Sequence, residues 1–546
     1  MKCRVPAGGL VRLGVRDGDG PEGSPMSGHR AAVPATFLSL VTGMALAGFA
    51  PARAATAPPP SPSSTWINSR LVELSFADPL VDPPLAAAKV RVLLPAGYGT
   101  STSRYPVLYL LHGAGDTAPS WTTNNDGQQS LEAFTADKDV IVVMPDAGKD
   151  SNAGWYSNWF NHGAFGPPRW EDFHIDQLVA FTDANFRTQA TRAGRVVAGL
   201  SMGGFGAMAD AARHPDLFAA ALSFSGAVNT TGIPYLEPAA FMALHDHFGT
   251  PTDAVWGSWQ EQEVRWRGHN PSDLASNLAL VPLWFATGEG VPGGPAPDDN
   301  DPGGLATESA IFSMNAGFAA ALTQAGVPYT FTPYPQGGHN WWHWQNDLHQ
   351  AWPFIAAVFA HPAAYPASWS HRSMETAFTV WGWQATTHRD VVEFLELAGV
   401  SSGGITLRGS GAVSLLSAPL YRPGGAYALS VSGARAGASP ATAVADAAGR
   451  LSFDVTLGPS HSLQQYTPQE RAAEAGDPSY WETAAVTITP QRAVAAVPAG
   501  GGASGSTGGG PPAALPNTTA EGAGSAIAAG AGLVVIASLR RRRRLP

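Results

Sequence analysis

Short apolar runs alternate with longer amphipathic stretches over the first two thirds of the chain. Alternation of strands and helices is typical of a mostly parallel sheet covered by helices on both faces, so we expect an α/β domain at residues 66–366. The strands are expected at Lys89–Leu94, Val107–Leu111, Val140–Met144, Arg195–Gly199, Ala220–Ser225, Pro282–Thr287 and Tyr329–Tyr334. The helices are expected at Glu171–Asn185, Gly203–His214 and Glu308–Ala325.

The pattern changes in the last third, where short apolar runs follow one another without helices between them. Gly, Pro and Asp residues separate the runs, which indicates a smaller all-β, sandwich-like domain at residues 372–492. Asp446–Gly449 is expected to be a hairpin turn. We find no catalytic constellation here, and a carbohydrate-binding or spacer role stays open. The strands are expected at Phe378–Trp383, Ile405–Gly409, Ala412–Leu416, Ala426–Val431, Leu451–Leu457 and Ala484–Thr489.

The first 54 residues have the features of a secretory signal with an upstream extension. Arg30 precedes the apolar run Phe37–Phe49, and Ala52-Arg53-Ala54 then matches an A-x-A cleavage site. The alternative is a membrane helix that is retained, but the run is shorter than the ~20 apolar residues that span a bilayer. We therefore expect an exported protein.

The last 54 residues suggest attachment to the cell surface. Residues 493–514 form a Gly/Ala/Pro-rich linker, which is expected to be flexible. Residues 515–546 contain Leu515-Pro516-Asn517-Thr518-Thr519, an apolar run and five arginines, an order that resembles the cell-wall sorting signal of Gram-positive bacteria. Thr519 stands where that signal has Gly. Three alternatives follow: attachment by a sortase, retention by a tail that contacts the membrane, or a linker without function.

Composition excludes several classes of function. The 546 residues carry a net charge of −10, and Arg540–Arg544 is the one dense basic run, so general nucleic-acid binding is not expected. The single cysteine, Cys3, lies in the segment that we expect to be removed. Disulfides and cysteine-based metal sites are therefore excluded.

A candidate nucleophile lies in a complete G-x-S-x-G motif, Gly199–Gly203. The motif follows a predicted strand and precedes a predicted helix, which is the context of a nucleophile elbow, so Ser201 is the proposed nucleophile. An oxyanion needs preorganised N–H donors, one of them from the residue after the nucleophile, here Met202. We assign the second donor to the amide of Ala114, in the loop after an earlier strand, with Gly113 as the alternative.

The general base is expected beyond the last strand, where Gly337–Trp341 supplies His339. His343 and His349 are interpreted as packed or partly exposed side chains rather than metal ligands. Spacing leaves the acid open, because several carboxylates follow the strand Pro282–Thr287, and part of this acidic loop fits a solvated or cation-binding turn equally well. The candidates are Glu289, Asp298, Asp299, Asp301 and Glu308.

These residues resemble the esterase D superfamily of α/β-hydrolases, and within it the secreted mycolyltransferases, or fibronectin-binding antigens, of mycobacteria and corynebacteria. The resemblance covers roughly residues 66–359 and implies an α/β-hydrolase fold with no cofactor or metal. It implies that Glu308 is the acid, and that His112, Trp159 and Trp341 contact the substrate. Gly203 and His112 depart from the mycolyltransferases and match ordinary esterases instead. The supporting motifs are Gly199-Leu200-Ser201-Met202, Trp155-Tyr156-Ser157-Asn158-Trp159, Trp170-Glu171, Glu308-x-x-Ile311-x-x-x-Asn315-x-x-Phe318 and Gly338-His339-Asn340-Trp341-x-x-Trp344-x-x-x-Leu348.

The leading hypothesis is a secreted or surface-attached serine carboxylester hydrolase or acyltransferase. It would act through an acyl-enzyme on lipid or acyl-sugar esters, with water or a sugar or glycerol hydroxyl as acceptor. The alternative is a non-catalytic adhesin or carbohydrate-binding protein that uses its tryptophan-rich segments, including Trp155, Trp159, Trp341 and Trp342, together with the β-rich domain.

Overall fold

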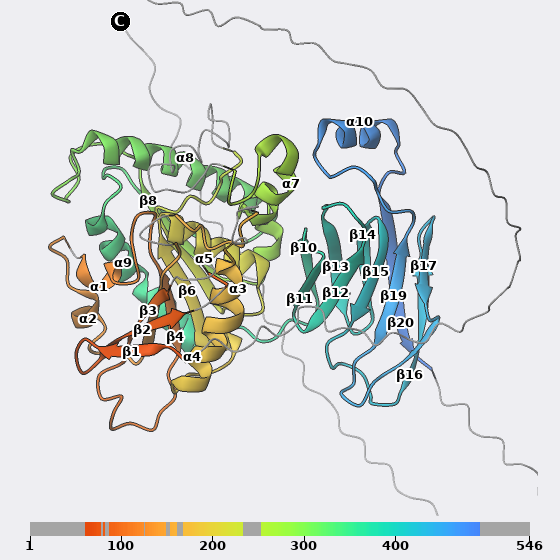
Figure 1. Ribbon diagram of the computed structural model, residues 1–546, viewed down its shortest axis with the longest axis horizontal. Helices are drawn as coiled ribbons and strands as arrows, with labels where there is room; N and C mark the ends of the chain where they lie inside the picture. Colours follow the sequence, from red (N-terminus) through yellow and green to blue (C-terminus); the bar gives the residue numbers. More distant parts are fainter. Residues whose placement is uncertain are drawn as a thin grey trace, which may run out of the picture. The chain divides into compact units, whose positions relative to one another are not determined.

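The computed structural model describes residues 61–491, apart from 78–79, 82–86, 125, 149–152, 161–167 and 233–252 (Figure 1). The expected signal (1–54), linker (493–514) and tail (515–546) lie outside the described residues, so these assignments stay predictions. Within the described part of the chain, no helix combines the length and the apolar character that a membrane crossing requires.

A nine-stranded mixed sheet forms the centre of the α/β part, residues 61–360. The pairs from β5 through β4, β6, β7 and β8 to β9 are parallel, whereas β1, β2 and β3 pair in antiparallel fashion and β3 joins β5. Strands β4 to β8 are buried along their whole length, as expected for parallel strands covered on both faces. In sheet order the strands are β1 (Ser63–Trp66), β2 (Leu71–Ala77), β3 (Ala87–Leu93), β5 (Ile141–Pro145), β4 (Val107–Leu111), β6 (Arg195–Leu200), β7 (Ala220–Phe224), β8 (Leu283–Gly288) and β9 (Thr330–Tyr334).

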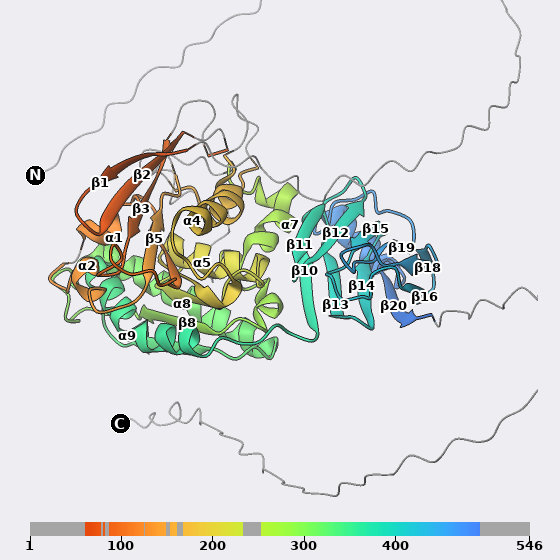
Figure 2. The same cartoon turned by 90° about the horizontal axis from the view of Figure 1, so that it is seen from below.

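Helices cover both faces of this sheet. Along β4, Val107, Tyr109 and Leu111 join the apolar core with α5 and α8, whereas Leu108 and Leu110 join a second core with α9. Helices α1, α2 and α9 lie together in both views (Figures 1 and 2). The helices are α1 (Ser120–Thr123), α2 (Leu131–Phe134), α3 (Trp170–Asp172), α4 (Val179–Asn185), α5 (Met202–Arg213), α7 (Trp259–His269), α8 (Pro302–Gln324) and α9 (Trp341–Ala360), with a π-helical segment at Phe173–Leu178 and 3₁₀ turns at Arg192–Gly194 and Ala275–Leu278.

The β part, residues 369–490, consists of two antiparallel sheets around one core, so the expected fold class is confirmed for both parts. Leu397 and Leu407 of one sheet belong to the same apolar core as Val413 and Val455 of the other. One short helix, α10 (Pro468–Gly476), precedes the last strand. The first sheet contains β10 (Trp369–Ser373), β13 (Leu395–Ser401), β14 (Gly404–Gly409), β20 (Glu482–Pro490), β16 (Ala426–Ser432) and β18 (Thr442–Val444), and the second contains β11 (Ala377–Val380), β12 (Trp383–His388), β15 (Gly411–Leu416), β19 (Ser452–Leu457) and β17 (Ala436–Ser439).

One strand prediction and part of one turn prediction in the β part were wrong. Phe378–Trp383 is not one strand, because Trp381 and Gly382, both with positive φ (49° and 75°), form a turn between β11 and β12. Asp446–Gly449 is a turn, in which the N–H of Gly449 donates to the carbonyl of Asp446 at 3.0 Å. It is not a hairpin turn, because the flanking strands β18 and β19 belong to different sheets.

The α/β and β parts share apolar and polar contacts. Met374 and Phe394, from the segments around β10 and β13, are buried in the core of the α/β part. The side chain of Asn277 bonds the backbone of Arg372 in both directions, at 2.9 and 3.0 Å. All residues named here belong to one compact unit that extends to Gln491. The two parts are therefore joined by an extended interface as well as by the chain.

Candidate active site

Ser201 lies in the tight turn between β6 and α5 with φ 51° and ψ −118°, a conformation that L-residues rarely adopt. Its backbone N–H donates to the carbonyl of Phe224 on β7 at 2.9 Å. A Cβ at Gly203 would lie 2.6 Å from the backbone of Leu111 and His112, so only glycine fits there. The sequence therefore forms the strained turn that a nucleophile elbow requires, with the hydroxyl of Ser201 partly exposed.

His339 joins Ser201 to Glu308 by two short contacts. Its Nε2 lies 2.9 Å from Oγ of Ser201, and its Nδ1 lies 2.6 Å from Oε2 of Glu308. His339 stands in the loop between β9 and α9, and Asn340 caps α9 by accepting a hydrogen bond from the N–H of His343 at 3.4 Å. The structure thus brings the ring of His339 into contact with Ser201, 138 positions earlier in the sequence, and with Glu308, 31 positions earlier.

Glu308 is fully buried (0% exposed) on α8 and reaches the ends of β7 and β8. Its Oε1 accepts hydrogen bonds from the hydroxyl of Ser225 at 2.7 Å, the hydroxyl of Thr287 at 2.9 Å and the N–H of Gly288 at 2.7 Å. With His339 on Oε2, the carboxylate has four partners, as a buried anionic group requires. Sequence reasoning missed Ser225, Thr287 and Gly288, although all three lie at or just after strand ends, where functional groups of parallel sheets gather.

The other candidate acids lie away from the ring of His339. Glu289 and Asp298 are exposed. Asp301 caps α8, since its carboxylate accepts the N–H of Gly304 at 2.6 Å. Among these alternatives, Glu308 is the carboxylate in contact with the histidine.

Asp299 is buried and holds the loop that carries His339. Its Oδ1 accepts from the N–H of Gly338 at 2.9 Å, the side-chain amide of Asn340 at 3.1 Å and Nε2 of His343 at 2.8 Å. Burial alone would raise the pKa of Asp299, but the N–H groups of Gly338 and Ala296 and the ring of His343 hold it below its ordinary value. His343 therefore has a packed, structural place, in agreement with the sequence interpretation of this residue.

Two backbone segments lie close to Ser201, namely the first turn of α5 and the loop after β4. The N–H of Met202 belongs to the first turn of α5, where backbone donors have no partner within the helix. Gly113, in the loop before Ala114, lies so close to the nucleophile that a Cβ there would be 3.3 Å from Cβ of Ser201. The loop after β4 thus approaches Ser201, as the assignment of Ala114 requires.

The expected contact of His112 with substrate is not supported by its position. His112 is 1% exposed, its Nε2 accepts the N–H of Ala147 at 3.1 Å, and its Nδ1 therefore donates to the carbonyl of Gly113 at 2.8 Å. Both ring nitrogens are occupied by backbone groups. The ring supports the loop after β4 from inside the protein and leaves no nitrogen for a substrate.

Of the tryptophans, Trp341 is partly exposed and Trp159 is not. Trp341 packs edge-on against Trp121 and Trp344, and Trp344 in turn packs against the ring of His339. Trp159 is 8% exposed, and its indole N–H donates to the carbonyl of Gly154 at 2.9 Å. Only Trp341 of this pair is therefore placed to line a cleft.

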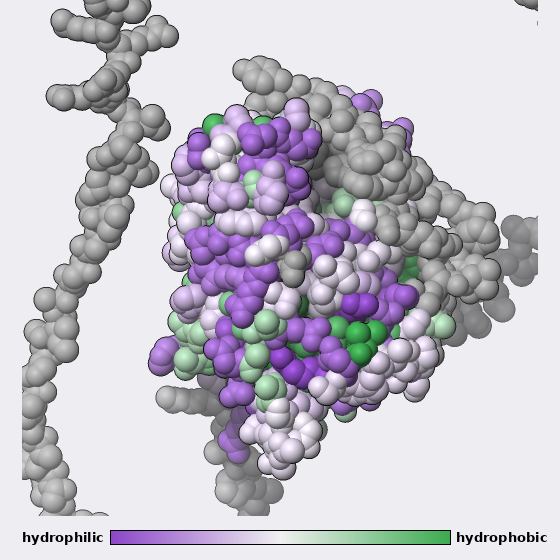
Figure 3. All heavy atoms as spheres, turned by 90° about the vertical axis from the view of Figure 1, so that its left-hand side faces the viewer, coloured by the Kyte–Doolittle hydropathy of each residue, from purple (hydrophilic) through white to green (hydrophobic). Residues whose placement is uncertain are grey.

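The side of the molecule on the left in Figure 1, where α1, α2 and α9 are drawn, mixes polar and apolar residues, and its apolar patches are small (Figure 3). This side therefore presents no broad apolar surface among the described residues.

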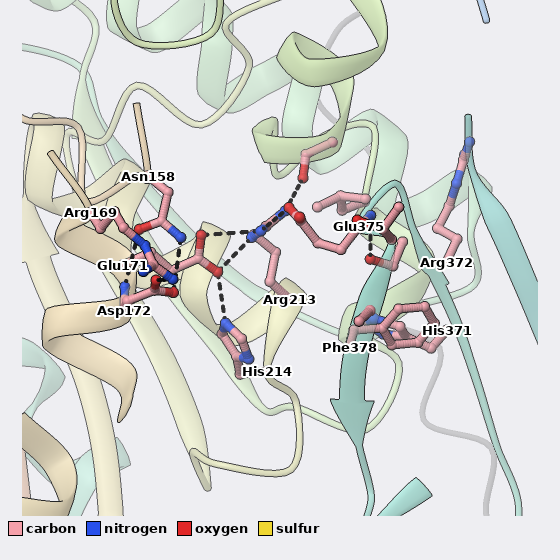
Figure 4. A pocket seen from close by; sticks show the side chains of 15 residues that line it. Asn158, Arg169, Glu171, Asp172, Arg213, His214, His371, Arg372, Glu375 and Phe378 are labelled. Atoms are coloured by element: carbon pink, nitrogen blue, oxygen red, sulfur yellow. Dashed lines mark hydrogen bonds and ion pairs between the residues drawn. The ribbon is translucent and has the colours of Figure 1, made fainter. Parts of the chain in front are cut away.

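A cavity of about 220 Å³ lies where the α/β and β parts meet, and its lining is strongly charged (Figure 4). Arg213, at the end of α5, bonds Glu171 at 2.9 and 3.1 Å and Glu375 at 2.7 Å, while His214 bonds Glu171 at 2.8 Å. Burial would raise the pKa of Glu171, but Arg213 and His214 hold it well below its ordinary value. The Trp170-Glu171 motif thus belongs to the junction and takes no part in the contacts of Ser201.

No cluster of metal-ligating side chains is found in the described part of the chain. No group of three or more His, Cys, Asp or Glu side chains there lies close enough together to hold a metal ion. The buried His343 and Asp299 pair each other, as described above.

Residues 86–355 match the family model described as "Putative esterase". Esterase Rv1288 of Mycobacterium tuberculosis is 36% identical over 253 residues, which cover 46% of this chain and 52% of that protein. The chain therefore spans about half the length of this relative. The diacylglycerol acyltransferase/mycolyltransferase Ag85B of Mycolicibacterium smegmatis is 29% identical over 268 residues, 46% of this chain and 76% of that protein.

The MPT51/MPB51 antigen of Mycobacterium tuberculosis is 30% identical over 245 residues, which cover 43% of this chain and 73% of the antigen. The crystal structure of MPT51 (FbpC1) covers 51% of this chain and 97% of its own, with 24% identity and a TM-score of 0.40. With a mostly parallel sheet, a serine elbow and these relatives, the chain belongs to the esterase family and has the fold of the α/β-hydrolases.

Proposed function

We propose that this protein is a serine carboxylester hydrolase or acyltransferase that forms an acyl-enzyme on Ser201. The observation that carries the proposal is the chain of contacts from Ser201 through His339 to Glu308, at 2.9 and 2.6 Å. Membership of an esterase family supports the same class of reaction. Lipid esters or acyl-sugar esters are the proposed substrates, in line with the acyltransferase activity for which the relative Ag85B is named.

The first half of the reaction transfers the acyl group to the enzyme. His339 takes the proton of Ser201 as the hydroxyl oxygen bonds the ester carbonyl carbon, and the amides of Met202 and Ala114 stabilise the oxyanion. Oε2 of Glu308 accepts a hydrogen bond from the Nδ1–H of His339, which fixes the tautomer with an unprotonated Nε2 and stabilises the imidazolium. The carbon–oxygen bond to the alcohol then breaks, and the alcohol leaves with the proton from His339.

The second half releases the acyl group from Ser201. His339 takes a proton from water or from a hydroxyl of a sugar or glycerol as the oxygen of that acceptor bonds the acyl carbon. The bond between this carbon and Oγ of Ser201 then breaks, and His339 returns the proton to Ser201. Water gives hydrolysis and a free acid, whereas a hydroxyl gives acyl transfer. The proposal includes both acceptors, and the two reactions give different products that can be measured.

The test uses a fluorophosphonate probe and short-chain aryl esters. The wild-type protein is expected to be labelled and to hydrolyse the ester, whereas Ser201→Ala is expected to do neither. Glu308→Gln is expected to lower kcat by about 10³- to 10⁴-fold, the range typical when a triad carboxylate is neutralised. A wild-type protein that neither labels nor hydrolyses would refute the proposal, and a fully active Glu308→Gln would remove Glu308 from it.

Adding trehalose or a diacylglycerol to an acyl donor separates transfer from hydrolysis. An acylated acceptor supports the transferase, and fatty acid as the sole product supports the hydrolase. Separate variants of Glu289, Asp298, Asp299 and Asp301 complete the comparison of acids, and those of exposed Glu289 and Asp298 are expected to stay active.

Of the four tryptophans that a non-catalytic adhesin or carbohydrate-binding role would use, two are closed to a ligand. Trp155 is 0% exposed and Trp159 is 8% exposed, so neither ring offers a face to a sugar, whereas Trp341 and Trp342 are partly exposed. Glycan binding by Ser201→Ala together with an inert wild-type protein would revive that alternative.

We also propose that the protein is exported and held at the cell surface, from the signal-like and sorting-like segments at the two ends of the sequence. Fractionation of cells after deletion of residues 515–546 tests the anchoring step. Release of the shortened protein into the medium is expected, while retention in the envelope would contradict it.

A further inference from the structure

The strand end after β7 contacts both the nucleophile and the acid. The carbonyl of Phe224 accepts the N–H of Ser201 at 2.9 Å, and the N–H of Ala227 donates to the carbonyl of Ser201 at 3.3 Å. Between these two residues, Ser225 directs its hydroxyl to Oε1 of Glu308 at 2.7 Å. One four-residue segment therefore fixes the backbone of the serine and the carboxylate of the acid at the same time.

Ser225 adopts a conformation that supports this role. Its φ of 48° is unusual for a residue other than glycine, and its side chain is fully buried. Its N–H donates to the carbonyl of Ala286 on β8 at 2.8 Å, one residue before Thr287. A strained backbone conformation persists only where surrounding contacts hold it. Here that conformation places the hydroxyl of Ser225 against the carboxylate of Glu308.

Thr287 donates to the same oxygen of Glu308 at 2.9 Å from the end of β8. Two hydroxyls and the amide of Gly288 thus occupy Oε1, which leaves Oε2 for the ring of His339. Without these donors, the carboxylate would be free to rotate on the side chain of Glu308 and turn Oε2 away from Nδ1.

We propose that Ser225 and Thr287 are positioning residues that hold the Glu308 carboxylate with one oxygen directed at His339. They act through Glu308 and touch no substrate. The inference rests on the proposed function, since it assigns how the acid of that site is held. Each hydroxyl removed weakens the fixation of Glu308 and leaves the serine, the histidine and the cleft in place.

The experiment compares four variants with the wild type in aryl-ester hydrolysis and fluorophosphonate labelling. Ser225→Ala removes the hydroxyl, and Ser225→Gly removes it while relieving the backbone at positive φ. Both are expected to lower kcat by about 10-fold, the equivalent of one hydrogen bond to a charged group, with KM changed less than about twofold. Thr287→Val is expected to do the same, and Thr287→Ser is expected to restore the wild-type rate.

The pH profile separates positioning from a general loss of structure. With one donor fewer, Oε2 of Glu308 is held less firmly against Nδ1 of His339 and stabilises the imidazolium less, so the acid limb of kcat/KM is expected to move to lower pH in Ser225→Ala and Thr287→Val. A loss of packing alone would lower the rate without moving this limb.

Ser223 provides the matched control, because it lies on β7 two residues before Ser225, is fully buried and has a hydroxyl with no hydrogen-bond partner among the described residues. Ser223→Ala is expected to keep the wild-type rate and profile. Wild-type kinetics in Ser225→Ala, activity recovered in Ser225→Gly, or an equal loss in Ser223→Ala would each overturn the inference. If Ser225→Ala fails to fold, the Thr287→Val and Thr287→Ser pair decides. A wild-type protein without labelling refutes the proposed function instead.

Discussion

His343 donates a hydrogen bond from Nε2 to Oδ1 of Asp299 at 2.8 Å, and both side chains are buried. The same oxygen accepts the N–H of Gly338, the residue before His339. The pair therefore fixes the loop that carries His339, the candidate base, while Glu308 fixes the ring of His339.

Asp299→Asn is expected to destabilise the protein by about 1–3 kcal/mol, because the amide replaces an oxygen that accepts a backbone N–H and leaves buried donors without partners. We expect a fall of about 10-fold in kcat as the loop of His339 loosens. Urea unfolding and ester hydrolysis measure the two effects. Asp298→Asn, at the exposed neighbouring position, should change stability by less than about 0.5 kcal/mol.

The acid stability of this loop follows from the lowered pKa of Asp299. A carboxyl whose folded pKa lies below the unfolded one stabilises the fold above the unfolded pKa, and that contribution is lost as the pH falls through the folded pKa. The stability difference between wild type and Asp299→Asn should therefore shrink in acid below about pH 4. A difference that stays constant down to pH 2 would argue against an ionised Asp299.

Asp347 on α9 is a buried carboxyl that the proposed mechanism does not use. Burial, and then the nearby charge of Glu308, raise its pKa well above the ordinary value of 3.8. A raised carboxyl pKa means that stability is highest below the unfolded pKa and falls as the pH rises towards the folded pKa. Asp347→Asn should therefore raise Tm by several degrees near pH 8 and have little effect near pH 3.

The activity of Asp347→Asn should stay within about threefold of the wild type at neutral pH, because an uncharged amide replaces an uncharged acid. Thermal unfolding across pH 3 to 9 provides the measurement. A variant that is less stable than the wild type at pH 8 would show that Asp347 is charged and paired.

His461 in the β part has an acceptor at each ring nitrogen. Nδ1 lies 2.6 Å from Oε2 of Glu393, and Nε2 lies 2.9 Å from the carbonyl of Tyr480. Burial lowers the pKa of His461, but these two acceptors and the charge of Glu470 outweigh it and raise the pKa above 6.5. Both nitrogens must carry protons to satisfy both partners, so the imidazolium is the form that fits.

The stabilisation from His461 is complete below its unfolded pKa near 6.5 and is lost as the pH rises through the higher folded pKa. Unfolding of the wild type should therefore become easier between about pH 6.5 and 8.5. His461→Gln should be less stable at pH 6 and should show a flatter profile, with ester hydrolysis unchanged. An identical pH profile in the two proteins would contradict this prediction.

Arg213 should be the most sensitive position of the junction. Arg213→Met leaves Glu171 buried without its cation, and breaking a buried pair in this way typically costs about 3–5 kcal/mol. Adding Glu171→Gln to Arg213→Met removes the unpaired charge and should recover more than about half of the lost free energy of unfolding. Chemical denaturation of the two variants tests the coupling, and purely additive losses would refute it.

The sequence predicts the α/β part well where buried strands are continuous and apolar. Val107–Leu111 coincides with β4, and Ala220–Ser225 extends one residue past β7. Strand β10, Trp369–Ser373, was missed because it alternates Trp, His and Ser, which lie buried, with polar residues that face solvent. Periodicity identifies apolar faces, and a buried histidine or serine carries no such signal.

For the site, spacing placed Ser201 and His339 on loops that meet, because both follow ends of parallel strands. Spacing did not distinguish Glu308 from Asp299, since both are buried, acidic and close to strand ends in the fold. In the structure, Glu308 lies on α8 and contacts the ring of His339, whereas Asp299 lies in the loop before α8 and bonds Gly338 and His343. The role of the Ser225 hydroxyl was not predicted either, because a single serine at a strand end forms no recognisable sequence pattern.

Met374 and Phe394 come from the β part of the chain, yet they fill the interior of the esterase part. A recombinant fragment that stops after α9 would leave an apolar void on its surface and a guanidinium without Glu375. Such a fragment should aggregate on expression even though it contains every residue of the proposed catalytic triad. A cloning boundary for crystallisation or screening therefore belongs after Pro490, at the end of β20.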